Sequence, residues 1–305
     1  MFASGKLLLT GEYFVLDGAL ALAIPVRFGQ WMEVEPGASK DELHWRSLNE
    51  KGEEWFGGTW LYQNGQAVIK SVNDTSVADR LQQLFSAVLA QDAAGLNSLF
   101  GTNITTRVDF PREWGLGTSS TLVSLLAQQT GVNPYQLLAD TFSGSGYDIA
   151  CATAKGPILY QRLSGNEVAV SEAKWQATYQ DHIYFTYQGH KQNSREGIRH
   201  YRELGGTQPT LIDQVTELTG AFLNAKKLEE AQDILREHEA FISNVLNMET
   251  VQNQRFADFP GLVKSLGAWG GDFVMVLSDW PAAQVKRYFT ERGCPVVLSF
   301  AEMVR

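Results

Sequence analysis

The stretch Gly115–Ser120, with the sequence GLGTSS, combines residue types that could hold a phosphate group. Gly115 and Gly117 have no side chains, so the backbone there can turn sharply or approach a ligand closely. The three hydroxyl residues that follow are favourable N-caps for an apolar helix from Ser119 onward. A helix start carries unpaired N–H groups and the positive end of the helix dipole, which attract an anion. A tight, capped strand-to-helix turn explains the same residues, and this stretch alone does not decide between the two interpretations.

Three further glycine-rich segments contain ionisable residues, namely 5–12, 144–148 and 267–272. Lys6 lies in the first of them, and Asp148 ends the second. Short glycine motifs match by chance often, so one such loop carries little weight. Four of them in one chain call for a common explanation.

The elements that position these segments follow from the periodicity of apolar residues. A helix at 75–92 and a strand at 102–110 precede the Gly115 loop, and Asn133-Pro134 starts a helix that runs to about Phe142. Further strands are expected at 158–162, near 168, and at 183–187, 273–277 and 296–300, and further helices at 211–223, 228–246 and 282–292. The pattern changes near Gly165, which predicts two domains, 1–165 and 166–305.

Two regions near the N-terminus are also expected to form strands. Residues 6–34 alternate between apolar runs and turn residues, with Tyr13–Leu16 as one run and Asp17-Gly18 as a hairpin signal. The aromatic residues from Trp45 to Tyr62 are interleaved with polar residues and glycine, a pattern typical of exposed edge strands.

The composition excludes several classes of protein. The 305 residues are 44% hydrophobic, enough for a large core, and the net charge of −9 argues against broad binding to nucleic acid or to an anionic membrane. A small anionic substrate stays compatible with that charge, because a few local cations and a metal ion can reverse the field inside a cleft. The two cysteines, Cys151 and Cys294, form no disulfide framework or metal-binding cluster, which fits a reducing cytosol. No apolar run is long enough to span a bilayer and no secretion signal is recognised, so we expect a cytoplasmic protein.

The order and the amino-acid sequences of the glycine-rich segments closely resemble those of the GHMP kinase superfamily, and the resemblance covers nearly the whole chain. GKLLLTGEYFVLDG resembles the first motif of that superfamily, GLGTSS its phosphate-binding second motif, and KSLGAWGGDF its third. GSGYDIA is similar to the Asp-containing motif of phosphomevalonate kinases, and GYDIA also matches the name of a GHMP subgroup. The resemblance implies an α+β fold with a ribosomal protein S5 domain 2-like N-terminal domain and a ferredoxin-like C-terminal domain.

The same resemblance implies ATP and Mg²⁺ as cofactors and assigns roles to individual residues. Asp148 would act as the base or orient the acceptor hydroxyl, and Lys6 would favour the ionised carboxylate and stabilise the transferring phosphoryl group. The remaining assignments are Gly115, Leu116, Gly117, Thr118, Ser119 and Ser120 for ATP, Ser119 and Asp140 for magnesium, and Glu12, Lys191, Ser194, Arg195, Gly270 and Gly271 for the substrate. Arginine suits bidentate contact with an acidic or phosphorylated group.

Each residue alone has an ordinary explanation. Lys6 could be a solvated lysine, Asp148 a cap after a glycine turn, and Ser119 an N-cap. The segment 183–197 could be a solvated loop. The joint occurrence of the motifs in the expected order favours the functional interpretation.

Two departures from the superfamily wording bear on the substrate. Trp269 stands where the third motif normally has glycine, so that either its ring shapes the substrate pocket or the loop has moved. Ala154-Lys155-Gly156 replaces the Tyr-Gly-Gly usual after the Asp motif of phosphomevalonate kinases.

The resemblance therefore implies an ATP- and magnesium-dependent kinase that acts on phosphomevalonate in isoprenoid precursor synthesis. A mevalonate kinase, or a kinase of another hydroxy acid or sugar, is the near alternative. A protein that keeps the fold as a binding or regulatory module without catalysis is the alternative of a different class. Neither nucleic acid nor a membrane is an expected partner, and a homodimer is compatible with a sequence that leaves the oligomeric state open.

Overall fold

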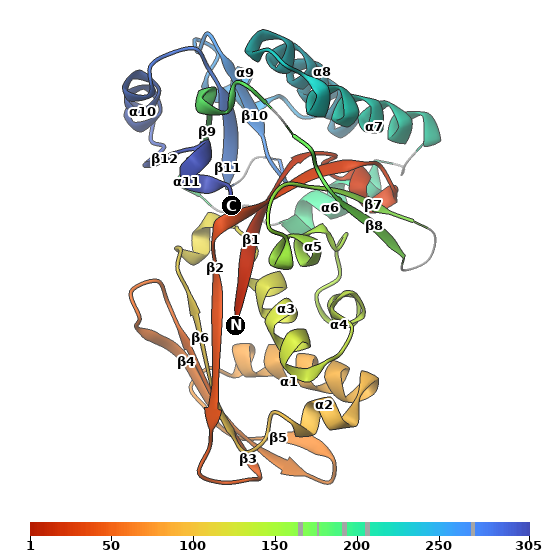
Figure 1. Ribbon diagram of the computed structural model, residues 1–305, viewed down its shortest axis with the longest axis vertical. Coiled ribbons are helices and arrows are strands. Elements are labelled where there is room, and N and C mark those ends of the chain that lie inside the picture. The colour runs from red at the N-terminus through yellow and green to blue at the C-terminus, as the bar shows by residue number, and fades with distance from the viewer. Residues whose placement is uncertain (164–166, 176, 191–193, 205–207, 270–271) are drawn as a thin grey trace. The chain divides into compact units, whose positions relative to one another are not determined.

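The computed structural model describes residues 1–305 except 164–166, 176, 191–193, 205–207 and 270–271 (Figure 1). The chain divides into two compact units. The first unit comprises Met1–Gly5, Phe28–Arg112 and Leu116–Thr153, and the second comprises Lys6–Arg27, Glu113–Gly115 and Ala154–Arg305. The domain boundary expected at 165/166 falls among the residues that are not described, and it stays a prediction.

The first unit combines a mixed sheet with helices packed against it. Strand β2 (Ala21–Pro36) enters this unit at Phe28 and pairs antiparallel with β6, whose other neighbour, β3, runs parallel to it. Outward from β3 follow β4 and the edge strand β5. The other elements of the unit are β3 (Glu42–Leu48), β4 (Glu54–Gln63), β5 (Gln66–Val72), β6 (Thr102–Val108), α1 (Thr75–Gln91), α2 (Ala93–Asn97), α3 (Thr118–Thr130), α4 (Pro134–Thr141) and α5 (Tyr147–Thr153).

The core of the first unit is built around the aromatic residues of β3 and β4. Trp45 and Trp60 are fully buried, and the ring of Trp60 meets that of Phe85 from α1 edge-on at 5.4 Å between centroids. Trp45 and Trp60 lie in strands, as expected. The prediction that these strands are exposed edge strands was wrong. The indole rings point from the sheet into the core that α1 covers, and the edge position belongs to β5.

The second unit contains a separate antiparallel sheet in the order β10-β11-β9-β12. In this unit, the first part of β2 also pairs with β7, which continues to β8. β1 (Phe2–Thr10) pairs with β2 and enters the unit at Lys6. The further elements are β7 (Ile158–Arg162), β8 (Val168–Glu172), β9 (Ile183–Tyr187), β10 (Leu262–Ser265), β11 (Phe273–Leu277), β12 (Val296–Ser299), α6 (Ser194–Glu203), α7 (Pro209–Asn224), α8 (Leu228–Leu246), α9 (Val251–Arg255), α10 (Ala282–Glu291) and α11 (Phe300–Met303). The two sheets and their helices confirm the expected α+β class.

Helix α8 carries an apolar stripe at helical spacing, with Leu235, Ile242 and Leu246 among its buried residues. Two polar residues, His238 and Glu239, interrupt this stripe and are buried as well. Ionisable side chains are rarely buried without partners, so their position on the inner face of α8 indicates a polar cluster inside the second unit.

The segment after β1 differs from the expected strand and hairpin. Phe14–Asp17 forms a short 3₁₀ helix that ends at Gly18, whose φ of 97° closes the turn. Asp17-Gly18 therefore ends a 3₁₀ turn, and the Asp17 carboxylate accepts hydrogen bonds from Tyr201 and Arg202 of α6. The run was expected to be a strand because its residues are apolar, but a short apolar run fits a buried strand and a buried helical turn equally well. In the structure Phe14 and Val15 are both buried in the 3₁₀ turn.

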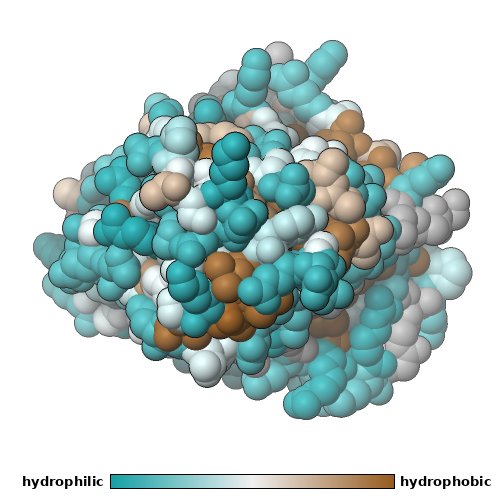
Figure 2. All heavy atoms as spheres, turned by 90° about the horizontal axis from the view of Figure 1, so that it is seen from below, coloured by the Kyte–Doolittle hydropathy of each residue, from teal (hydrophilic) through white to brown (hydrophobic). Residues whose placement is uncertain are grey.

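Most of the face in Figure 2 is hydrophilic, with smaller groups of apolar residues among the charged ones. In the part of the chain that the structure describes, no helix has both the length and the apolar character needed to cross a membrane.

Candidate functional site

Three of the glycine-rich segments meet at Gly115 in the second unit. The Lys6 ammonium of β1 donates a hydrogen bond to the Gly115 carbonyl oxygen at 3.1 Å. On the side where a Cβ would stand, Gly115 lies against the Asp272 carboxylate, and its φ is 67°. Glycine is therefore needed here twice, for its left-handed backbone and for the space that the carboxylate fills. A lysine, a glycine loop and an acid from distant parts of the sequence are thus brought together.

We expect the substitution Gly115→Ala to lower the free energy of unfolding by about 1–3 kcal/mol, because the new methyl group would overlap the Asp272 carboxylate. Chemical denaturation measures the loss. Gly131→Ala is the matched control, since Gly131 has a φ of 77° but nothing within 4 Å of a Cβ. Equal losses at the two positions would mean that contact with Asp272 is unimportant and that only backbone strain matters.

Helix α3 begins directly after this junction without a side-chain cap. Its N-cap is Gly117, with a φ of 95°, and no side chain accepts a hydrogen bond there. The prediction that the hydroxyl residues act as N-caps was wrong, because Thr118 is already helical and the Ser120 hydroxyl donates to the Gly117 carbonyl at 2.8 Å. Ser119, in the first turn, is exposed. The positive end of α3 is therefore available to an anion.

Asp148 lies in the first turn of α5 and is partly buried in the first unit. Gly146, with a φ of 91°, supplies the turn before it. Burial raises the pKa of the nearby Tyr135 phenol, and the charges of Cys151 and Asp148 raise it further. Lys6 belongs to the second unit, so the pairing of Lys6 with Asp148 stays a prediction.

Both magnesium-ligand candidates lie in the first unit and offer oxygen donors. Asp140 is exposed on α4, and its carboxylate accepts a hydrogen bond from Gln136 of the same helix at 2.7 Å. Among the described residues, no group of three or more His, Cys, Asp and Glu side chains could hold a metal on its own. A hydroxyl and one carboxylate suit Mg²⁺, which usually binds few protein ligands and completes its shell with phosphate and water. Their joint role stays a prediction.

Glu12, expected near the substrate, is fully buried in the second unit. Its carboxylate forms an ion pair with Lys264 of β10, which is also fully buried. Burial raises the pKa of Glu12 and the Lys264 charge opposes that rise. Any influence of Glu12 on a substrate would be indirect. Sequence reasoning gave no role to Lys264, although the lysine stands in the segment KSLGAWGGDF.

The fold is shared with solved structures of small-molecule kinases. Phosphomevalonate kinase of Streptococcus pneumoniae, solved with phosphomevalonate and AMPPNP, matches with a TM-score of 0.71 and 15% identity over 98% of this chain and 99% of that chain. Mevalonate kinase of Methanococcus jannaschii matches with a TM-score of 0.69 and 15% identity over 95% and 94%. Galactokinase of Lactococcus lactis, solved with galactose, matches with a TM-score of 0.64 and 13% identity over 95% and 87%. The chain has the GHMP kinase fold.

Comparison of sequences adds nothing to this likeness in structure. No family model matches the chain, and no curated protein matches it. The solved kinases are 13–16% identical in sequence to this chain. This similarity establishes the GHMP kinase fold but does not identify the phosphoryl acceptor.

In this GHMP kinase fold the anomalous Trp269 of the third motif points into the core of the second unit. Its ring is buried in a cluster with Tyr13, Phe14 and Tyr201, and its backbone N–H donates to the Tyr13 hydroxyl at 3.1 Å. Burial raises the pKa of Tyr13, so this hydroxyl stays protonated at neutral pH. Trp269 therefore fixes the third motif to the first by packing and one hydrogen bond.

The segment expected to bind substrate is only partly described. Lys191, Gly270 and Gly271 lie outside the described residues, and Ser194 and Arg195 are the first two residues of α6. Within 183–197, directly after β9, the Gln188 N–H donates to the Asp272 carbonyl at 2.9 Å. The residue that follows β9 is thus hydrogen-bonded to the same acid that packs on Gly115.

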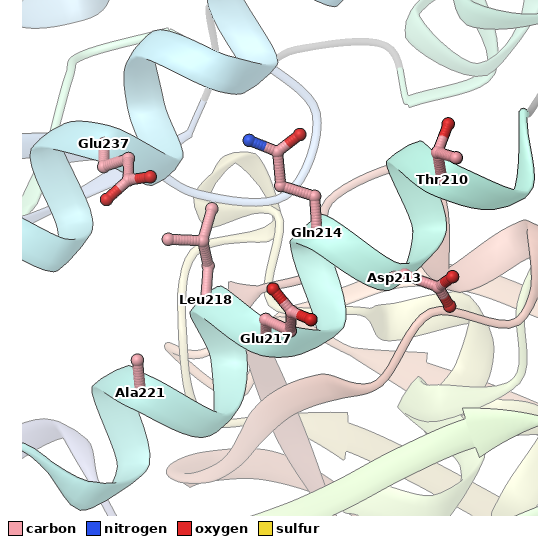
Figure 3. A pocket seen from close by; sticks show the side chains of 7 residues that line it. All are labelled: Thr210, Asp213, Gln214, Glu217, Leu218, Ala221 and Glu237. Atoms are coloured by element: carbon pink, nitrogen blue, oxygen red, sulfur yellow. The ribbon is translucent and has the colours of Figure 1, made fainter.

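A surface groove of about 480 Å³ lies between α7 and α8, and none of the residues that line it belongs to a glycine-rich motif. In Figure 3 its side chains come from α7 and, across the groove, from Glu237 of α8. Asp213, Glu217 and Glu237 give it a negative lining, which would repel phosphate. The groove is therefore no candidate for the nucleotide.

Proposed function

We propose that the chain is an ATP-dependent small-molecule kinase that transfers the γ-phosphoryl group to a small anionic acceptor. The acceptor that we propose is phosphomevalonate. The observation that carries this proposal is the junction at Gly115, where Lys6 is held next to a glycine loop that opens into the uncapped helix α3. An uncapped helix start and an ammonium group each stabilise negative charge, and phosphoryl transfer requires that charge to be neutralised.

In the proposed reaction each residue performs one task. The backbone from Gly115 to Ser120 binds phosphate oxygens, and Lys6 stabilises the charge on the transferring group. The Asp148 carboxylate accepts the proton of the acceptor hydroxyl or orients that hydroxyl for attack. Ser119 and Asp140 would hold Mg²⁺, which supplies charge neutralisation across the phosphates when bound.

The choice of phosphomevalonate rests on the sequences of two motifs and on one of the solved structures that share the fold. GEYFVL and GSGYDIA are closest in wording to phosphomevalonate kinases, and the Streptococcus pneumoniae enzyme of that type shares the fold. Mevalonate kinases and galactokinases share it too, so mevalonate, other hydroxy acids and sugars are the alternative acceptors.

The test is ADP release from Mg-ATP with mevalonate, phosphomevalonate, diphosphomevalonate and a panel of sugars. We expect turnover that depends on both magnesium and acceptor and is fastest with phosphomevalonate. Fastest turnover with another acceptor would correct the substrate and keep the kinase. ATP binding without turnover on any acceptor would instead favour a non-catalytic binding or regulatory protein.

We further propose a cytoplasmic enzyme whose partners are ATP and its small substrate. The net charge of −9 and the presence of only two cysteines support this setting. A homodimer is an expectation that size-exclusion chromatography with light scattering would test.

A further inference from the structure

Four ionisable side chains are buried together in the second unit. Glu12, His238 and Lys264 have no exposed surface, and Glu239 is 3% exposed. Lys264 forms an ion pair with Glu12 and lies 3.6 Å from a Glu239 oxygen. His238 lies 3.4 Å from the other Glu12 oxygen. Burying this many ionisable groups is costly unless their charges balance.

The histidine supplies no positive charge to this cluster. Its Nε2 accepts a hydrogen bond from the Gly11 N–H at 3.3 Å, so that nitrogen carries no proton. Burial, together with the Lys264 charge, lowers the pKa of His238 well below its usual 6.5. Lys264 is therefore the one cation for two carboxylates among the described residues of the cluster.

Glu239 is the carboxyl group that the cluster leaves unbalanced. Its oxygens have only weak contacts with the Ser265 backbone and hydroxyl, too long or bent for regular hydrogen bonds, whereas Glu12 has its ion pair with Lys264. Burial raises the pKa of Glu239 to about 7. The positive charge of Lys264 lowers this pKa, and the negative charge of Glu12 raises it further. The charged groups that face it are Lys264 from β10 and Glu12 from the turn after β1, with neutral His238 beside it on α8.

The cluster is connected directly to two of the motifs. Glu12 lies between Gly11 and Tyr13 in the first motif, and Tyr13 accepts the hydrogen bond from Trp269 in the third. Lys264 is the first residue of the KSLGAWGGDF segment. The same segment contains Asp272, which packs on Gly115. The ion pair of Lys264 with Glu12 therefore joins the third motif to the first, beside the hydrogen bond of Trp269 with Tyr13.

We propose that Lys264 and Glu239 are positioning residues that make the attachment of the first motif to the third depend on pH. When Glu239 is protonated, Lys264 pairs with Glu12 alone and the buried charges balance. When Glu239 is ionised, Lys264 is shared between two carboxylates and one negative charge is left over, which loosens the Glu12 turn. The effect on catalysis rests on the proposed kinase function, whereas the effect on stability does not.

The sign of the effect on stability follows from proton linkage. Glu239 binds its proton more tightly in the folded chain than in the unfolded one, so stability falls as pH rises through its folded pKa of about 7. His238 acts in the opposite direction, and its contribution fades within about one pH unit above its ordinary value of 6.5. The window from pH 6.5 to 8.5 therefore covers the loss of the Glu239 proton. Glu12, whose pKa burial also raises, is kept in the Glu239 variant, so comparison of that variant with the wild type assigns the effect to Glu239.

The experiment compares Glu239→Gln with Glu237→Gln, a change of the same type at an exposed position of the same helix. We expect the Tm of the wild type to fall between pH 6.5 and 8.5 and the KM for Mg-ATP to rise roughly fivefold or more, with a smaller change in kcat. Glu239→Gln should abolish both dependences, and Glu237→Gln should keep both.

A wild-type pH dependence that persists in Glu239→Gln, or disappears equally in Glu237→Gln, overturns the proposal. If Glu239→Gln does not fold, infrared spectroscopy of the wild type decides. A buried, protonated carboxyl band present at pH 6.5 and lost by pH 8.5 supports the proposal, and its absence at pH 6.5 refutes it. If no acceptor is phosphorylated, the kinase proposal fails while the Tm comparison still tests Glu239.

Discussion

Replacing Asp148 by Asn is expected to reduce turnover by roughly 10²–10⁴-fold while leaving the affinity for Mg-ATP nearly unchanged. An amide keeps the size of the side chain but cannot accept the proton of the acceptor hydroxyl. The partly buried position of Asp148 in the first turn of α5, after Gly146, leaves room for the substitution. Steady-state kinetics with the best acceptor, together with calorimetric titration of the nucleotide, separates the two quantities.

Asp79→Asn provides the control for that variant, because Asp79 is an exposed aspartate on α1 of the same unit. It should retain wild-type kcat and Tm. Full activity in Asp148→Asn would remove this residue from its role, whatever the acceptor proves to be. Loss of nucleotide affinity in parallel with kcat would show that Asp148 serves the ATP site and is not the base.

The sequence predicted the elements with strong periodicity almost to the residue. The strand at 158–162, the strand at 183–187 and the helix at 228–246 have the expected bounds. In each case the apolar pattern and the turn residues around it point to the same structure. Short elements were harder: β10 has four residues and contains a lysine, so no pattern distinguished it from a loop.

At the candidate site, the sequence predicted which segments matter and was less accurate about what individual atoms do. The glycines at 115 and 117 do take left-handed conformations, which only a small range of residues adopts. The following hydroxyls were taken as caps because Ser and Thr usually serve that way, but the glycine itself occupies the cap position. Packing against Asp272, which is distant in the sequence, could not be foreseen from local propensity.

The buried cluster shows a limit of a different kind. Glu12 and Lys264 are separated by most of the chain, and each looks like a solvated residue in its own segment. Burial of a Glu or Lys is rare, so a sequence argument assigns them to the surface or to substrate contact. Only the fold brings His238 and Glu239 of α8 against them.

Lys264→Met is expected to be strongly destabilising, with a loss of about 3–5 kcal/mol in the free energy of unfolding at pH 8. Methionine fills most of the volume but leaves the Glu12 and Glu239 carboxyl groups buried without a cation. Urea denaturation measures the loss. Lys286→Met on α10 is the control, since Lys286 is exposed and its replacement should change stability by about 0.5 kcal/mol or less.

The loss should also depend on pH in a way that identifies its cause. Without Lys264 both carboxyl groups bind protons more tightly in the folded chain, so the penalty grows as pH rises above their ordinary value of 4.5. At pH 5 the variant should therefore lie closer to the wild type than at pH 8, and adding Glu12→Gln should recover part of the stability at pH 8. A loss that is equal at both pH values would indicate a packing defect at β10, because a cavity does not titrate, and the charge balance described for this cluster would then be wrong.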